Sequence, residues 1–115
     1  MPAYDFQYQF ARAVMFLLKR QTIRAKRKNR PRVGQTAHCY TGMRTKACAL
    51  LGRWVIREVR DINILSEGIL LDGGALCNCD LDKLARLDGF LNWPDMAMWF
   101  DKTHGLPFHG DLIIW

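Results

Sequence analysis

Acidic side chains are scarce in the first half of this chain. Residues 1–60 contain fourteen lysines and arginines but only Asp5 and Glu58, whereas residues 61–115 contain three basic and nine acidic side chains. So uneven a distribution produces a strong positive field over one surface and favours a polyanionic partner. The alternative is a solvated cationic face without a partner.

The chain also lacks a long hydrophobic run. Its longest uninterrupted apolar stretch is AVMFLL, residues 13–18, which is too short to span a bilayer and is followed by no signal-cleavage site. We therefore expect no secretory signal, no association with a membrane, and a location in the cytoplasm.

Clusters of metal ligands are equally scarce. Cys77 and Cys79 are close in sequence, but no second close pair of cysteines or histidines accompanies them, and the three histidines are scattered. A structural zinc ion requires four such ligands, so we expect no metal ion and no cofactor. Without an export signal, the four cysteines are expected to be free thiols.

Apolar residues, in contrast, make up half of the 115 residues, which is enough for one core in a single domain. Strands are predicted over residues 21–24, 35–42 and 53–65, in GILLDGG, and in the closing GDLIIW. The alternation of residues 53–65 slips, which predicts a bulge near residues 58–60.

Three helices are predicted from apolar spacing and capping residues. Residues 10–17 carry apolar side chains at helical spacing, so a first helix should end near Leu18. Asp80 is the expected N-cap of a second helix that ends before Gly89. Asn92 is expected to cap a third. These elements predict an α+β fold in which strands enclose a small core, as a partly closed barrel with helices packed on it.

The densest cationic segment is KRQTIRAKRKNRPR, residues 19–32, with eight cations in fourteen residues. If residues 21–24 form a strand, Ile23 points into the core while Thr22 and Arg24 point to the opposite face. Lys19 would approach them from the end of the first helix. The segment then divides into an anchored half, residues 19–24, and a mobile basic half, residues 25–32.

Lys19, Thr22 and Arg24 fit the K-x-x-T-x-R core of the ASCH domains, a family related to the PUA-like RNA-binding fold. The chain resembles the phage and prophage branch of that family in three further segments, YTGMRTK, LDGF and THGLPFHGDLIIW. The family usually has glycine two residues before the lysine. This chain has Leu17 there, for which we expect a further half-turn of helix.

The resemblance implies one ASCH domain over residues 1–115, a small PUA-like β-barrel with helices at its side, in the cytoplasm of a bacterium or a phage-infected bacterium. It also implies a cleft lined by the K-x-x-T-x-R segment that binds RNA or a nucleotide. Cations contact phosphates without reading sequence, and Tyr40 and Phe90 are candidate platforms for stacked bases. The candidate phosphate contacts are Arg20, Arg24, Lys26, Arg27, Lys28, Arg30 and Arg32, with Arg44 and Lys46 as a second patch.

A second branch of the family is similar to amidohydrolases that deacylate N4-acylcytidine nucleosides with a lysine, a threonine and a glutamate. Lys19 and Thr22 match the first two, and the acidic position falls on Asp88. Lys19, crowded by Arg20 and Arg24, should lose its proton more readily and act as general base toward Thr22 or water.

In that reaction Arg24 would stabilise the oxyanion, and Asp88 would hold Lys19 or protonate the leaving amine. Asp88 is also expected at the C-terminus of a helix, where a carboxylate is disfavoured, so we predict that it pairs with Lys19. The plain alternative is that Lys19 and Arg24 clamp phosphates and that Thr22 is a strand residue. A third class is a phage protein that binds a host protein.

Overall fold

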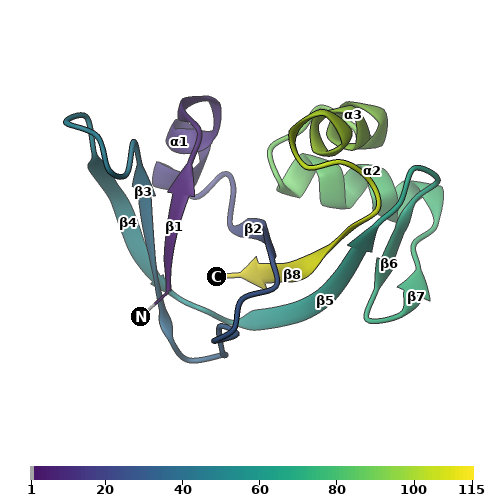
Figure 1. The fold of residues 1–115 in the computed structure, drawn as a ribbon, viewed down its shortest axis with the longest axis horizontal. Coiled ribbons are helices and arrows are strands. Elements are labelled where there is room, and N and C mark those ends of the chain that lie inside the picture. Colours follow the sequence, from purple (N-terminus) through teal and green to yellow (C-terminus); the bar gives the residue numbers. More distant parts are fainter. Residues whose placement is uncertain (1) are drawn as a thin grey trace.

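A computed structural model of the chain describes residues 2–115 (Figure 1). The elements, in chain order, are β1 (Ala3–Phe6), α1 (Tyr8–Met15), β2 (Gln21–Ala25), β3 (Thr36–Thr41), β4 (Ala49–Val55), β5 (Glu58–Ile64), β6 (Ile69–Leu71), β7 (Gly74–Ala75), α2 (Asn78–Leu87), α3 (Trp93–Thr103) and β8 (Phe108–Ile114).

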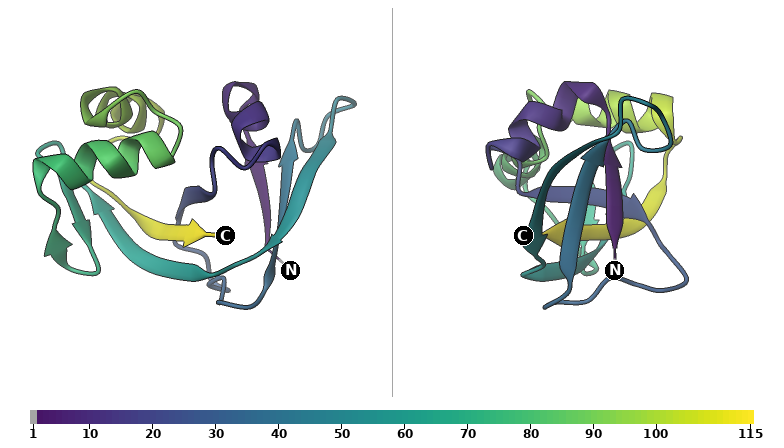
Figure 2. Two further views of the ribbon diagram at one scale, coloured as in Figure 1. Left: turned by 180° about the vertical axis from the view of Figure 1, so that it is seen from behind. Right: turned by 90° about the vertical axis from the view of Figure 1, so that its left-hand side faces the viewer.

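The strands form two sheets. A three-stranded sheet has the order β1-β3-β4, and a five-stranded sheet has the order β2-β8-β5-β6-β7. Only β1 and β3 pair in parallel; the other pairs are antiparallel. The three helices are divided between the sheets: α1 lies beside the three-stranded sheet, and α2 and α3 lie over the five-stranded sheet (Figures 1 and 2). The α+β class is thus confirmed. Over residues 2–115 the two sheets do not close into one hydrogen-bonded barrel.

The slip in the alternation of residues 53–65 has a different cause from the bulge that was expected. The chain leaves β4 at Val55 and begins β5 at Glu58, in the other sheet. Between them, Ile56 is fully buried, and its backbone amide donates to the Gln35 carbonyl. The Arg57 amide donates to the carbonyl of Ile114 in β8. The change of side-chain parity therefore marks the passage between sheets.

The end of α1 also differs from the prediction. The helix ends at Met15, and Leu17 adopts φ +60°, in the left-handed region that favours glycine. The amides of Leu18 and Lys19 both donate to the Ala13 carbonyl and close this turn. Leu17 therefore keeps the backbone conformation that glycine provides in the family pattern, and no further half-turn of helix forms.

The caps of α2 and α3 follow the sequence with one exception. Asn92 caps α3 by accepting a hydrogen bond from the Asp95 amide (2.9 Å), as predicted. Gly89 has φ +98° directly after the Asp88 C-cap of α2. Asp80, however, lies in the first turn of α2, and Cys77 is the N-cap residue.

Trp115 joins the cores of the two sheets. Its indole is 1% exposed, stacks on Trp54 of β4 and meets Phe6 of β1 edge-on. Its backbone amide donates to the Arg20 carbonyl just before β2. None of the helices in residues 2–115 has the length and hydropathy of a membrane span.

Candidate functional site

A cavity of about 190 Å³ lies between the end of β1, the start of α1, strand β2, helix α3 and the segments on either side of α3. Four polar side chains predicted from the sequence, those of Lys19, Thr22, Arg24 and Asp88, all line it. Six aromatic rings form much of the remaining wall: Phe6, Phe10, Phe90, Trp99, Phe100 and Phe108. The structure thus brings the K-x-x-T-x-R segment and the acidic position together at one small, largely aromatic hollow.

Lys19 and Asp88 form a buried ion pair, as predicted. The Lys19 ammonium lies 3.0 Å from Asp88 Oδ1 and donates to the Asp88 backbone carbonyl at 2.6 Å. That carbonyl belongs to the C-cap residue of α2, and carbonyls at a helix C-terminus lack intrahelical partners. Lys19 therefore neutralises the Asp88 carboxylate and also donates a hydrogen bond to a backbone carbonyl at the end of the helix.

Gln21 is the second partner of this carboxylate. Its side-chain amide donates to Asp88 Oδ1 at 3.2 Å, and Gln21 is 4% exposed. Burial lowers the pKa of Lys19 and raises the pKa of Asp88, and the attraction within the pair opposes both shifts. The lowered pKa of Lys19 was predicted, but burial is its main cause, and Arg24 adds a smaller effect.

Thr22 and Arg24 point to the same face of β2, while Ile23 belongs to the core. Arg24 Nε donates to the Thr22 hydroxyl at 2.9 Å, and its terminal nitrogen donates to the Asp5 carbonyl at 2.7 Å. The guanidinium also lies over the Phe6 ring, 4.9 Å from its centroid. Arg24 is thus fixed by the backbone of β1 and by ring contacts, with no carboxylate pairing among residues 2–115.

The aromatic wall is continuous. Trp99 of α3 contacts Phe10 of α1 and Phe90 of the α2–α3 turn, with centroid distances of 6.0 and 5.5 Å. Phe100 and His104 continue the row toward Phe108 of β8. The sequence predicted Phe90 as a platform for a stacked base, but it did not identify Trp99. Helical spacing of apolar residues is the same for a helix face in the core and for a helix face that walls a cavity.

The basic loop, residues 26–34, is tethered, which corrects the expectation of a mobile basic half. Lys26 donates to the buried Asp111 of β8 at 2.6 Å and lies 2.7 Å from Asp61 of β5. Arg30 Nε also donates to Asp111, at 2.9 Å, and Pro31 is buried. Lys26 and Arg30, both expected to contact phosphates, are therefore paired with carboxylates of the protein itself.

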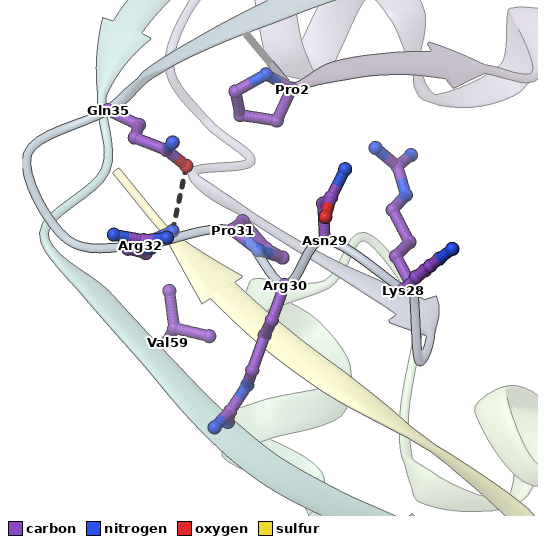
Figure 3. Close-up of a pocket in the computed structure, with 9 residues that line it drawn as sticks. Pro2, Lys28, Asn29, Arg30, Pro31, Arg32, Gln35 and Val59 are labelled. Atoms are coloured by element: carbon purple, nitrogen blue, oxygen red, sulfur yellow. Dashed lines mark hydrogen bonds between the residues drawn. The ribbon is translucent and has the colours of Figure 1, made fainter.

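The other predicted cations are differently placed. Arg27 donates to the Ala3 carbonyl at 3.1 Å and lies 4.7 Å from the centroid of the Tyr4 ring. Lys28 and Arg32 project around a hollow within the loop (Figure 3), and within residues 2–115 neither forms an ion pair. Arg20 donates to the Trp115 carbonyl.

The second predicted patch lies elsewhere. Arg44 and Lys46 are in the β3–β4 hairpin, at the opposite end of β3 from the basic loop (Figure 1). Tyr40 lies on β3 and does not line the cavity. The structure thus brings together the residues of the anchored half and separates them from Arg44, Lys46 and Tyr40.

The four cysteines are free, and over residues 2–115 no three histidine, cysteine, aspartate or glutamate side chains gather where a metal ion could be held. Comparisons of the chain with protein-family models, with curated proteins and with solved structures found no match.

Proposed function

We propose that this chain is an ASCH-domain protein, with an open form of the PUA-like barrel, that binds a single base of RNA or of a nucleotide in the aromatic cavity. The observation that supports this most directly is the convergence of Lys19, Thr22, Arg24 and Asp88 on one hollow walled by aromatic rings. Aromatic faces that stack a base, with polar groups at its edge, are the usual means by which proteins hold an unpaired base.

The size of the cavity supports a small guest. At about 190 Å³ it is smaller than the roughly 300–1,000 Å³ of sites that enclose drug-sized ligands. A base or a nucleoside fits this scale, whereas a folded nucleic-acid segment has to remain outside.

The polar groups suit the edge of a base. Arg24 uses two of its nitrogens on Thr22 and Asp5 and retains further N–H donors. The Thr22 hydroxyl accepts from Arg24, so its own hydrogen remains available to an acceptor on the guest. Since these groups are held by strand β2 and by the backbone of β1, little ordering is required when the guest binds.

Calorimetric titration with the four ribonucleoside 5′-monophosphates tests this proposal. Replacement of Trp99 by leucine should weaken nucleotide binding by about 5- to 150-fold, since one base–aromatic stack contributes about 1–3 kcal/mol. Trp93→Leu is the matched control, because Trp93 is a half-buried residue of the same helix outside the cavity. No binding by the wild-type protein, or equal losses in both variants, would refute the proposal.

Amide hydrolysis is the second candidate, and the lowered pKa of the buried Lys19 favours it. A neutral Lys19 amine would accept the proton of the Thr22 hydroxyl or of a water molecule as that oxygen attacks an acyl carbon. Arg24 would stabilise the oxyanion, and the protonated Lys19 would return the proton to N4 of cytidine as the bond between N4 and the acyl carbon breaks. Attack by water gives the carboxylate product directly, whereas attack by Thr22 leaves an ester that a water molecule then hydrolyses to the carboxylate and the free hydroxyl.

Incubation with N4-acetylcytidine, followed by chromatography, separates the two candidates. A hydrolase releases cytidine and acetate, and loses that activity in Thr22→Val, which keeps the shape of the side chain but removes its hydroxyl. A binding protein leaves the compound intact while still retaining nucleotides.

A further inference from the structure

The hollow within the basic loop is lined by four cations and, among the residues that the structure describes, by no acidic side chain. Its volume is about 890 Å³, and Arg27, Lys28, Arg30 and Arg32 surround it together with Asn29 and Gln35 (Figure 3). Of the four, only Arg30 forms an ion pair within residues 2–115. A concave surface with this excess of positive charge attracts an anion that is long enough to contact several of these cations at the same time.

The hollow is held open by the fold. The ion pairs of Lys26 and Arg30 with Asp111 fasten the loop to β8, and the buried Pro31 holds its centre. At one side of the hollow, the Arg32 amide donates to the Gln35 side chain at 2.9 Å, within a turn of four residues (Figure 3). The free cations Lys28 and Arg32 are therefore presented by a fixed backbone, which reduces the entropic cost of binding.

Two arginines join this hollow to the aromatic cavity. Arg24, which lines the cavity, and Arg27, which lines the hollow, donate to the Asp5 and Ala3 carbonyls on the open edge of β1. Both guanidinium groups lie over the ring of Tyr4, at 5.5 and 4.7 Å from its centroid. They are three positions apart in the chain, so their Cα atoms are at most about 11 Å apart.

We propose that cavity and hollow form one path for single-stranded RNA, in which the cavity holds a base and the hollow holds the neighbouring phosphates. This inference rests on the proposed binding of a base in the cavity and specifies the ligand as a strand rather than a free nucleoside. Arg24 and Arg27 contact the phosphate between the two subsites, and Lys28 and Arg32 contact the phosphates beyond it.

The experiment compares a fluorescein-labelled RNA hexanucleotide of mixed sequence with the four nucleoside 5′-monophosphates. The variant Lys28→Gln/Arg32→Gln leaves the ion pairs of Lys26 and Arg30 intact. At about 100 mM salt it should bind the hexanucleotide at least tenfold more weakly, and the slope of log K against log salt should become shallower by about 1.4, since each phosphate contact on a single strand contributes about 0.7. Its affinity for the monophosphates should stay at the wild-type value.

The matched control is Arg53→Gln/Lys83→Gln, which removes the same charge from two exposed residues outside both hollows. It should keep the wild-type hexanucleotide affinity and salt slope. Wild-type values in Lys28→Gln/Arg32→Gln, equal losses in the control, or a hexaglutamate peptide that binds as tightly as RNA would each overturn the inference. Failure of the base-binding proposal has a separate signature, unchanged monophosphate binding in Trp99→Leu.

Discussion

The Lys19 ammonium and the Asp88 carboxylate, 69 residues apart in the chain, form an ion pair in which both side chains are less than 7% exposed. Buried charges of this kind require both a partner and further hydrogen bonds. Gln21 and the Asp88 backbone carbonyl provide them. The pair therefore fixes the end of α2 against β2 and sets the polar side of the cavity.

Removal of one partner should cost far more than removal of both. Lys19→Met leaves the Asp88 carboxylate buried without its counter-charge, and we expect the free energy of unfolding to fall by about 3–5 kcal/mol. The double variant Lys19→Met/Asp88→Asn removes both charges and retains the oxygen that accepts from Gln21. Its stability should lie within about 1 kcal/mol of the wild type.

Urea unfolding of the wild type, both single variants and the double variant provides the measurement. A large coupling energy in this double-mutant cycle is the expected result. Additive losses would show that the two groups contribute to stability independently. Nucleotide binding should be weakened in all three variants, since each alters the polar side of the cavity.

Leu17→Gly should stabilise the protein. Leu17 has φ +60°, a conformation that costs an L-residue about 1–2 kcal/mol, and its side chain is 41% exposed. Glycine relieves that strain but loses about 0.5–1 kcal/mol through the greater freedom of the unfolded chain. We expect a net gain of about 0.5–1 kcal/mol in urea unfolding.

Leu18→Gly is the matched control for this substitution. Leu18 is 77% exposed and lies outside the left-handed region. The substitution Leu18→Gly should lower the free energy of unfolding by about 0.5–1 kcal/mol. Equal effects at residues 17 and 18 would contradict the assignment of strain to Leu17.

Gly110→Ala should disrupt the register of β2 against β8. A Cβ at Gly110 would overlap the carbonyl oxygen of Arg24, which belongs to the backbone of β2 and has no room to move aside. We expect a loss of at least about 2 kcal/mol in the free energy of unfolding, together with weaker nucleotide binding. Gly68→Ala, whose Cβ would meet only the Leu81 side chain at 3.8 Å, should leave nucleotide binding unchanged.

The tether of the basic loop should weaken in acid. Hydrogen bonds from Lys26 and His109 lower the pKa of Asp61 below its ordinary value. A carboxyl whose pKa is lowered by folding stabilises the protein above its unfolded pKa of about 3.9, and that stability is lost as the pH falls through the folded value. Between about pH 5 and pH 3, the stability of the wild type should therefore fall more steeply than that of Asp61→Asn.

Chemical unfolding at a series of pH values measures this difference. Asp101→Asn serves as control, because Asp101 is exposed and forms no ion pair in the part of the chain that the structure describes. It should reproduce the wild-type profile. An Asp61→Asn profile parallel to that of the wild type would contradict the role of Asp61 in the tether.

A local pattern predicted the part of the site that lies within one element: the alternation around Ile23 placed Thr22 and Arg24 on one face of β2. The pairing of Asp88 with Lys19 required more. The resemblance identified Asp88 as the acidic position, and the unfavourable field at a helix C-terminus indicated a cationic partner. Strand β1 was not predicted. It is only four residues long, and its partner β3 lies some 35 positions further along the chain, so no local pattern marks it.

The basic loop shows where the sequence was insufficient. Eight cations in fourteen residues indicated a polyanion surface, but not that Lys26 and Arg30, in addition to Lys19, are paired with carboxylates of the protein. The tether depends on the register that sets Arg24 of β2 opposite Asp111 of β8. That register follows from the packing of both strands and is not encoded in either segment alone.

The sequence by itself determined the α+β composition, the N-cap of α3 and the excess of positive charge, each of which follows from composition or from neighbours within a few positions. The four polar groups at the cavity were identified from the strand pattern around Ile23 together with the resemblance to ASCH domains. Only the tertiary structure decided that six aromatic rings from both ends of the chain surround those groups, and which cations stay free. Burial and pairing between distant segments are properties of the packed chain, because they depend on which surfaces meet when water is excluded.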